Sequence, residues 1–292
     1  MPTVPFKQVD VFTHMPFSGN PVAVILGTDG LDSVRMQQIA RWTNLSETTF
    51  VIPPADPKAD YGVRIFSPGG ELPFAGHPTI GTAHALLEAG LVTEHDGILV
   101  QQSAIGLVAL SIRRRHGGRR VIAFDLPAAS FTSLGLEHIS QLDAALGNAV
   151  QRTPAPRIVN VGPRWLVARL DTAADVLACR PDFRAIDALC VAVGASGVTL
   201  FGDYPPGARV HIEVRSFAPG QGVNEDPVCG SGNGCVGAFI HTTGLRHYGN
   251  AIIASQGAAL ERNGHIEIDI DGSTIRVGGS AVTCIDGHIN TA

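Results

Sequence analysis

The sequence predicts an α+β protein made of two homologous halves, each a curved sheet around a central helix. Three observations support this prediction. Short β-rich runs outnumber helical patterns along the 292 residues. A segment of the first half recurs in the second with the same order of predicted elements. In both copies the segment contains a helical pattern of small and apolar residues on all sides, which is typical of a buried helix.

The predicted strands are rich in apolar and β-branched residues and are separated by Gly, Pro, Asn and Asp. They cover residues 6–12, 21–26, 48–52, 63–66, 98–102, 121–126, 165–170, 198–201, 210–217, 265–270 and 274–277. The predicted helices cover residues 31–43, 78–88, 139–146, 182–189 and 234–243. In the first helix, Val34, Ile39 and Trp42 are expected to form the apolar side. The second and the last are the two expected to be buried.

The repeat begins with Val63–Gly69, which recurs as Val214–Gly220. After a three-residue insertion the register holds for roughly 30 further positions. The matched pairs are Gly76 with Gly230, Gly90-Leu91 with Gly244-Leu245, Ile98 with Ile252, and Gln102 with Gln256. Each copy therefore predicts a strand, a Gly-rich turn, a buried helix, a Gly-Leu stop and a strand. The seam is expected near residues 126–132, which gives halves of 1–128 and 129–292, with the last strand free to return to the first half.

The composition excludes several classes of protein. With 45% hydrophobic and 16% charged residues the chain can form cores, so disorder is not expected. The formal net charge of −5 leaves no excess of cations for a nucleic acid. The densest basic run, residues 113–115 with Arg119 and Arg120 around Gly117-Gly118, is interpreted as a solvated hairpin tip. Without a membrane span or a signal-peptide pattern, we expect a cytoplasmic protein that binds neither nucleic acid nor membranes.

Cysteine and histidine spacing gives no sign of a metal site. The five cysteines include no Cys-x-x-Cys pair, which predicts reduced thiols. His77 and His84 are seven residues apart and share a helix face, but no third ligand accompanies them. The turn at 230–235 fits neither a dinucleotide fingerprint nor a P-loop. We therefore expect no metal and no organic cofactor.

A Gly-rich turn opens the central helix in both copies, at Ala75–Thr79 and at Cys229–Asn233. Free backbone N–H groups and the helix dipole make such a turn an anion site. If the halves face each other about a pseudo-twofold axis, both turns point into one interdomain cleft, where a small carboxylate can be held. The alternative, glycines that only pack a buried helix, explains one copy better than two.

Three side chains near these turns are candidates for chemistry. Glu47 lies at the start of an apolar strand, where burial would raise its pKa towards the value that a general acid and base needs. A surface glutamate at a strand start is the alternative. Asp226 can reach an amine or hydroxyl of a bound molecule, or can simply form an Asp-Pro turn. His77 lies inside the first turn, and an ordinary helix-start histidine is its alternative.

Cys229 suggests a different chemistry. A thiol directly before a helix N-terminus is expected to have a lowered pKa and thiolate character. Its counterpart in the repeat is Ala75, so these two positions cannot supply the matched thiols of a two-base racemase. Cys235, deeper in the helix, is expected in the core.

Four motifs in order are shared with a known family: Asp10–Thr13 with Phe17–Pro21, Leu45–Phe50, Glu71–Thr79, and Glu225–Ser231. Over essentially the whole chain they resemble the PhzF family, the phenazine-biosynthesis-like isomerases. The resemblance implies a diaminopimelate epimerase-like fold with two pseudo-symmetric, mostly antiparallel halves, and usually a homodimer. It also implies a cofactor-free isomerisation of a dihydro-hydroxyanthranilate, in which a glutamate moves a proton along one face of the ring.

Carried over to this sequence, the resemblance makes Glu47 the catalytic proton shuttle. His77 and Asp226 become catalytic residues that orient polar groups of the substrate, and the amides around Gly76, Gly230 and Ser231 bind its carboxylate. Cys229 departs from the pattern, because a small hydroxyl residue is expected there.

The leading hypothesis is therefore an isomerase that shifts a proton on a small carboxylate-bearing substrate, with Glu47 as general acid and base. One alternative is a one-cysteine epimerase, racemase or dehydratase of an amino acid that pairs Cys229 with Glu47. The other is a non-catalytic protein that binds a small molecule.

Overall fold

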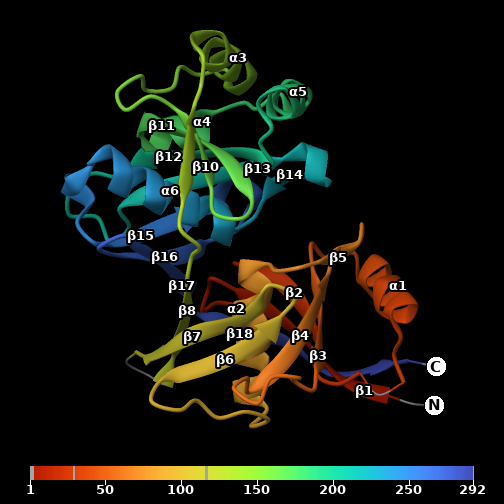
Figure 1. Ribbon diagram of the computed structural model, residues 1–292. Coiled ribbons are helices and arrows are strands. Elements are labelled where there is room, and N and C mark those ends of the chain that lie inside the picture. The colour runs from red at the N-terminus through yellow and green to blue at the C-terminus, as the bar shows by residue number, and fades with distance from the viewer. Residues whose placement is uncertain (1–2, 29, 116–117, 292) are drawn as a thin grey trace. The chain divides into compact units, whose positions relative to one another are not determined.

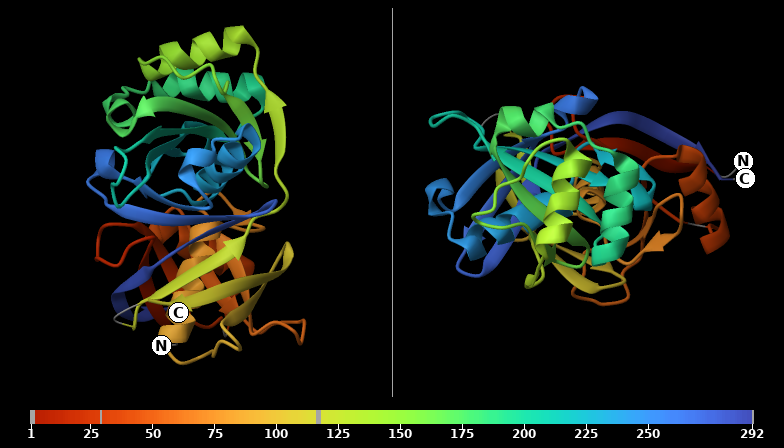
Figure 2. Two further views of the ribbon diagram at one scale, coloured as in Figure 1. Left: turned by 90° about the vertical axis from the view of Figure 1, so that its left-hand side faces the viewer. Right: turned by 90° about the horizontal axis from the view of Figure 1, so that it is seen from above.

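The computed structural model describes residues 3–28, 30–115 and 118–291. Residue contacts divide the chain into two compact units. One unit comprises the described residues up to Phe124 and from Gly278 onward, and the other is Asp125–Val277. In each unit strands surround one helix, α2 in the first and α6 in the second (Figure 1, Figure 2). The division between residues 128 and 129 stays a prediction about the two homologous halves.

The first unit is a mixed sheet around α2. Its elements are β1 (Thr3–Val11), β2 (Asn20–Ile25), α1 (Ser33–Thr43), β3 (Thr48–Ile52), β4 (Tyr61–Phe66), β5 (Glu71–Leu72), α2 (Gly76–Glu88), β6 (Ile98–Ser103), β7 (Gly106–Arg114), β8 (Arg120–Asp125) and β18 (Ala281–Asn290). Strand β1 pairs antiparallel with both β2 and β18, so the last strand of the chain lies beside the first. Strands β2 and β3 are parallel, as are β4 and β6, and the other pairs are antiparallel.

The second unit repeats this plan around α6. Its elements are β9 (Ser130–Ser133), α3 (Leu136–Leu146), β10 (Arg157–Asn160), β11 (Arg164–Thr172), α4 (Ala173–Ala178), α5 (Phe183–Val193), β12 (Gly197–Asp203), β13 (Ile212–Ala218), β14 (Val223–Asp226), α6 (Gly230–Thr243), β15 (Ala251–Gln256), β16 (Gly264–Asp271) and β17 (Thr274–Gly279). Three short 3₁₀ helices lie at Pro219–Gln221, Arg246–Tyr248 and Ala258–Leu260.

The predicted internal repeat is confirmed by strand pairing. In the first unit β4 pairs antiparallel with β5 and, across α2, parallel with β6. In the second unit β13 makes the same two pairings with β14 and, across α6, with β15. Both helices end alike, because Leu91 N–H donates to the Leu86 carbonyl and Leu245 N–H donates to the Ile240 carbonyl. The glycine before each leucine has a positive φ, 67° at Gly90 and 72° at Gly244, which explains the Gly-Leu stop.

The central helices are buried, as their composition predicts. Helix α2 packs so closely on the sheet that a Cβ atom at Gly81 would lie 2.4 Å from a methyl carbon of Val22. In α6 a Cβ atom at Gly237 would lie 2.6 Å from a methyl carbon of Ile268. Small residues therefore set the distance between each helix and its sheet.

The expected apolar side of α1 is wrong in part. Ile39 is buried, but Val34 and Trp42 are 77% and 79% exposed. The buried side consists of Met36, Ile39 and Ala40, which pack with residues of β2 and β3. Their spacing of three and four residues follows the helical period more closely than the spacing of the predicted trio.

The basic run forms a hairpin end in the residues that the structure describes. Strands β7 and β8 are antiparallel with Arg114 opposite Arg120, and Arg115 N–H donates to the Arg119 carbonyl over 2.8 Å. Most of these arginines are exposed, while Arg120 is half-buried. Gly117 lies outside the described residues. All five cysteines are free thiols, and the described helices include none with the length and apolar character that a membrane crossing needs.

Candidate functional site

Glu47 lies directly before β3, with its side chain only 18% exposed. Its carboxyl atom Oε2 is buried and has no hydrogen-bond partner among the described residues. Burial raises the pKa of Glu47 to about 7, although the Ser46 side chain acts in the opposite direction. The expected rise in pKa is therefore confirmed, and the alternative of a surface glutamate is wrong.

His77 is the second residue of α2, and its ring is buried. The Nε2 atom of His77 lies 3.4 Å from Oε2 of Glu47. This distance is slightly longer than a strong hydrogen bond, but a small rotation of either side chain would close it. The structure thus brings together two candidates that are far apart in the sequence.

Gly76 begins α2, and the cap residue Ala75 has no side-chain hydrogen bond to the first turn. The first N–H groups of a helix have no carbonyl partner within the helix, so this end can receive an anion. Packing gives a second reason for glycine, because a Cβ atom at Gly76 would lie 2.9 Å from Cζ of Phe124. Both interpretations of the glycine therefore remain compatible with the first copy.

A buried polar network fixes the start of α2, and the sequence analysis did not find it. Tyr61 donates to Gln101 over 3.1 Å, and Gln101 donates to Thr79 over 3.0 Å. Thr82 donates to Thr49, two residues beyond Glu47, over 2.8 Å. These hydrogen bonds connect α2 to β3, β4 and β6 and so hold His77 close to Glu47. Threonine and glutamine within otherwise apolar strands were the available signal.

Cys229 caps the first turn of α6 in the second unit. Its sulfur accepts a hydrogen bond from Gly232 N–H over 3.3 Å and lies 3.6 Å from Oγ of Ser231. Burial, reinforced by the nearby Asp226 carboxylate, raises the pKa of the Cys229 thiol well above its ordinary value. The expected lowering of this pKa is therefore wrong, because desolvation outweighs the effect of the helix end. Cys235 is fully buried in the core, as expected.

Asp226 ends β14 and shapes the turn that leads to Cys229. Its Oδ1 atom accepts a hydrogen bond from Val228 N–H over 3.0 Å, as in an Asx turn. Gln256 fixes the same turn from β15, since its Nε2 donates to the Asp226 carbonyl over 2.9 Å. The Oε1 atom of Gln256 accepts from Cys229 N–H and from Asn233 Nδ2, over 3.1 and 2.8 Å. One buried side chain thus connects β14, the turn and α6.

Gly230 and Ser231 are the first two residues of α6. The Ser231 hydroxyl accepts a hydrogen bond from Nε1 of Trp165 over 2.9 Å. At Gly232 a Cβ atom would lie 2.7 Å from the hydroxyl oxygens of Thr199 and Ser216, so the turn is tightly packed.

The candidate residues therefore form two groups. Gly76 and His77 lie with Glu47 in the first unit, while Asp226, Cys229, Gly230 and Ser231 lie together in the second. Across the described part of the chain, no three His, Cys, Asp or Glu side chains are arranged to hold a metal ion. The first group is suited to proton transfer. The second is suited to hydrogen bonding by its amides and its hydroxyl.

Comparison with known proteins identifies relatives over nearly the whole chain. The chain is 42% identical over 290 residues to "Antisense-enhancing sequence 1" of Schizosaccharomyces pombe, with 97% of each chain covered. It is 33% identical to a trans-2,3-dihydro-3-hydroxyanthranilate isomerase of Pseudomonas chlororaphis, over 96% of this chain and 97% of the relative.

A crystal structure of a PhzF-family phenazine biosynthesis protein from Bacillus anthracis matches with a TM-score of 0.88 and 24% identity, over 99% of this chain and 100% of that chain. A hydroxyproline epimerase from Agrobacterium vitis also matches, with a TM-score of 0.63 and 14% identity over 98% of this chain and 92% of that chain. The two matches confirm the predicted epimerase-like α+β fold. The family model for phenazine biosynthesis-like proteins matches residues 9–287. By that match and by the relatives that are named isomerases, this chain belongs to the PhzF family of isomerases.

Proposed function

We propose that this protein is a cofactor-independent isomerase that shifts a proton on a small carboxylate-bearing substrate. Glu47 is the general acid and base of the proposed reaction. The observation that supports the proposal most strongly is a buried carboxyl, with a pKa of about 7, only 3.4 Å from an imidazole nitrogen. Such a carboxyl is present in both protonation states near neutral pH, as a residue that both takes and returns a proton requires.

The proposed reaction has two proton transfers. The Glu47 carboxylate takes a proton from a carbon of the substrate, and the electron pair of the broken C–H bond enters the adjacent unsaturated system. The resulting carboxylic acid exchanges its proton with solvent and then returns a proton to another carbon of that system, so the atoms and charges balance. His77 is proposed to hold the carboxyl in position between the two transfers, since its Nε2 atom faces Oε2 of Glu47.

The helix ends are proposed to bind the substrate. First-turn amides carry partial positive charge, which suits the amides around Gly76, Gly230 and Ser231 to a carboxylate. Asp226 is proposed to orient an amine or hydroxyl of the substrate. For Asp226 the proposal rests on the family resemblance, because its observed hydrogen bond with Val228 also serves the turn.

The name of one relative supports a proposal for the substrate class. The Pseudomonas chlororaphis relative is named for trans-2,3-dihydro-3-hydroxyanthranilate, a cyclic diene acid with an amine and a hydroxyl group. We propose a dihydroaromatic or amino-acid-like acid for this chain as well.

Hydrogen exchange tests this proposal directly. Wild-type protein is incubated in heavy water with trans-2,3-dihydro-3-hydroxyanthranilate and with a set of amino acids, and mass spectrometry detects any deuteron taken up. Glu47→Gln should abolish uptake without loss of fold, whereas Glu137→Gln on the exposed surface of α3 should leave it unchanged. Undiminished uptake in Glu47→Gln would overturn the proposed mechanism.

The alternatives make different predictions. A one-cysteine enzyme needs an accessible thiolate, but the Cys229 thiol is buried, its pKa is raised, and it caps α6. A non-catalytic binding protein would be stabilised by small carboxylates in a thermal shift assay yet exchange none of their protons.

A further inference from the structure

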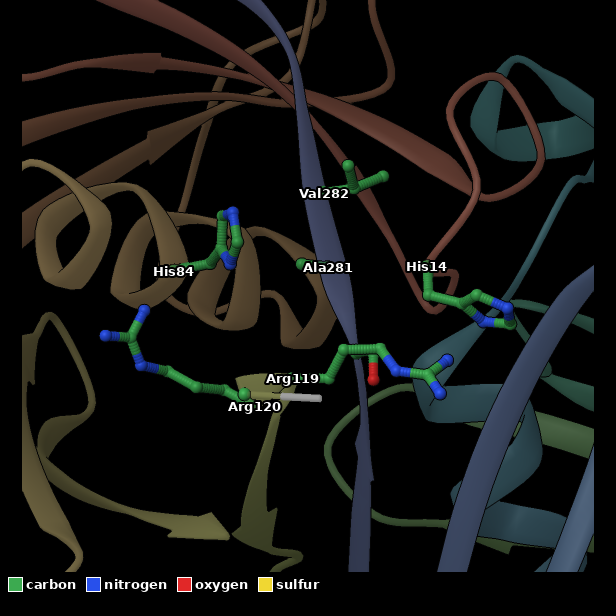
Figure 3. A pocket seen from close by; sticks show the side chains of 8 residues that line it. His14, His84, Arg119, Arg120, Ala281 and Val282 are labelled. Carbon is green, nitrogen blue, oxygen red and sulfur yellow. The ribbon is translucent and has the colours of Figure 1, made fainter. Parts of the chain in front are cut away.

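Polar side chains that line one pocket do not always point to one ligand. In the first unit a pocket of about 220 Å³ is lined by His14, His84, Arg119 and Arg120, among other residues. Arg119 and Arg120 extend to opposite sides of β18, so one small ligand cannot lie between them (Figure 3). Polar side chains that do converge lie in the second unit, at the start of α6.

Trp165 and Ser231 meet at this point. Trp165 belongs to β11, and its Nε1 atom donates a hydrogen bond to Oγ of Ser231 over 2.9 Å. Trp165 is only 5% exposed, and its partner in the parallel pairing of β11 with β12 is Gly197. A Cβ atom at Gly197 would lie 2.6 Å from Cζ3 of the indole. The glycine therefore leaves room for the ring, and close packing fixes the direction of the indole N–H.

The hydrogen bond from Trp165 determines what the Ser231 hydroxyl can do. An indole N–H only donates, whereas a serine hydroxyl has one proton and two lone pairs. The indole occupies one lone pair, so the hydroxyl proton is left to be donated. Among the described side chains, the other partner of this hydroxyl is the Cys229 sulfur at 3.6 Å, which is a weak acceptor. The Ser231 proton is therefore available to a stronger acceptor such as a carboxylate oxygen.

We propose that Trp165 is a positioning residue for the substrate carboxylate. Its indole N–H fixes the Ser231 hydroxyl, and the hydroxyl donates its proton to the carboxylate beside the amides of Gly230 and Ser231. The inference rests on the proposed function, which assigns the carboxylate to these amides. A hydrogen bond to a charged group is roughly twice as strong as a neutral one, and a donor to the hydroxyl oxygen strengthens it further. Trp165 acts through Ser231 and needs no contact with the substrate.

Calorimetric titration with anthranilate tests this inference. Anthranilate carries a carboxylate beside an amine, and aniline, which lacks the carboxylate, is the reference ligand. Wild type should bind anthranilate saturably and more tightly than aniline. Ser231→Ala should weaken anthranilate binding by about tenfold or more, and Trp165→Phe by about three- to tenfold. Trp42→Phe, at an exposed position of α1, is the matched control and should stay within about twofold of wild type.

A double-mutant cycle separates positioning from packing. In the Ser231→Ala background, Trp165→Phe should change anthranilate binding by less than about twofold, because the hydroxyl that Trp165 positions is gone. A ring that only packs would weaken binding equally in both backgrounds, and that result would overturn the inference. So would unchanged binding in Trp165→Phe, or the absence of saturable anthranilate binding by wild type.

Nuclear magnetic resonance of the indole N–H groups gives a second measurement that leaves Trp165 in place. The chain has two tryptophans, so Trp42→Phe assigns both signals. Ser231→Ala should move the Trp165 signal upfield, since its hydrogen bond is lost. Anthranilate at half-saturation of wild type should shift this signal, and the same concentration should shift it far less in Ser231→Ala. Equal shifts in the two proteins would contradict the inference, and this measurement decides if Trp165→Phe does not fold.

These measurements need no turnover, so they are distinct from the test of the proposed reaction. Coupling between Trp165 and Ser231 together with undiminished deuterium uptake in Glu47→Gln would reject the proposed mechanism and support the role of Trp165. Loss of uptake in Glu47→Gln without that coupling would do the reverse.

Discussion

The Nε2 atom of His77 lies 3.4 Å from Oε2 of Glu47, where the start of α2 meets the start of β3. The neighbouring hydrogen bond from Thr82 to Thr49 holds these elements together. The pair therefore combines a fixed position with a carboxyl that titrates near neutral pH. That combination leads to two predictions about pH.

The rate should depend on the ionisation of Glu47. Because the carboxylate takes the first proton, kcat/KM should rise with pH through about 7 and level off above it. In Glu47→Gln this pH dependence should be absent, and the rate should fall at least a hundredfold. A hundredfold is the lower end of what general acid–base catalysis contributes. Steady-state kinetics between pH 5 and pH 9 measure both effects, and a limb near the ordinary glutamate pKa would contradict the assignment.

The ionisation of Glu47 should also lower the stability of the protein as the pH rises, whereas it raises the rate. The folded-state pKa of Glu47 is raised, so between an ordinary value of 4.5 and about 7 the unfolded chain loses its proton before the folded chain does. Ionisation therefore favours unfolding across this window, and the stabilising effect of the protonated group is lost as pH rises through 7. Relative to Glu47→Gln, wild type should lose of the order of 3 kcal/mol between pH 4.5 and pH 8. Urea unfolding of both proteins at several pH values measures this difference, and a constant difference would exclude a raised pKa.

The sequence predicted much of the fold because the repeat fixed the order of elements. The Gly-Leu stops and the buried small-residue helices are local signals. Both helices end at the predicted stops, at Gly90 and at Gly244. Strands such as β5 and β14 were not predicted, because segments of two to four residues are too short to show the alternating hydrophobic pattern of a strand. β18 was missed as well, because it mixes Asp286, Gly287 and His288 with apolar residues and becomes a strand by pairing with β1.

Some features of the candidate site could likewise be predicted from the sequence, and others could not. The sequence left Glu47 open between a buried and a surface position, and the structure shows a largely buried side chain. The rise in the Cys229 pKa could not be predicted, because it depends on complete desolvation and on the position of Asp226, which are tertiary properties. The role of Gln256 was also hidden, since its match with Gln102 in the repeat says nothing of hydrogen bonds, and Gln102 instead accepts from the amides of Ala55 and Asp56.

Cys229 should be dispensable for turnover but not for stability. Cys229→Ser retains an acceptor for Gly232 N–H and should keep its activity within a few-fold of wild type. Cys229→Ala loses the cap and should destabilise the protein by about 1 kcal/mol. Kinetics and thermal unfolding of the two variants separate these effects. Loss of activity in a folded Cys229→Ser would instead favour the one-cysteine alternative.

Gln256 should be among the most sensitive polar positions of the second unit. Gln256→Leu leaves Cys229 N–H without its acceptor and Asn233 Nδ2 with only the Cys229 carbonyl, at about 1–3 kcal/mol for each donor hydrogen left unsatisfied. We expect a loss of 2 kcal/mol or more by urea unfolding, on the same basis. The control Gln141→Leu, on the exposed surface of α3, should change stability by less than about 0.5 kcal/mol. Equal effects in the two variants would mean that Gln256 does not hold the turn.

Gly76 should be restricted by packing against Phe124. In Gly76→Ala the new Cβ atom would lie 2.9 Å from Cζ of Phe124, a buried ring that also packs edge-on against Phe74. The ring cannot move freely, so we expect a loss of about 1–3 kcal/mol from overpacking. Phe124→Leu removes the clashing ring atom, and the double variant should therefore be less destabilised than the sum of the two single variants.

A thermodynamic cycle from urea unfolding of the four proteins measures this coupling. Because alanine keeps the backbone N–H of residue 76, phosphate or carboxylate binding by the amide should survive wherever the double variant folds. Additive losses of stability in the cycle would show that Phe124 does not explain the glycine, and would leave close approach of a substrate as the reason for it.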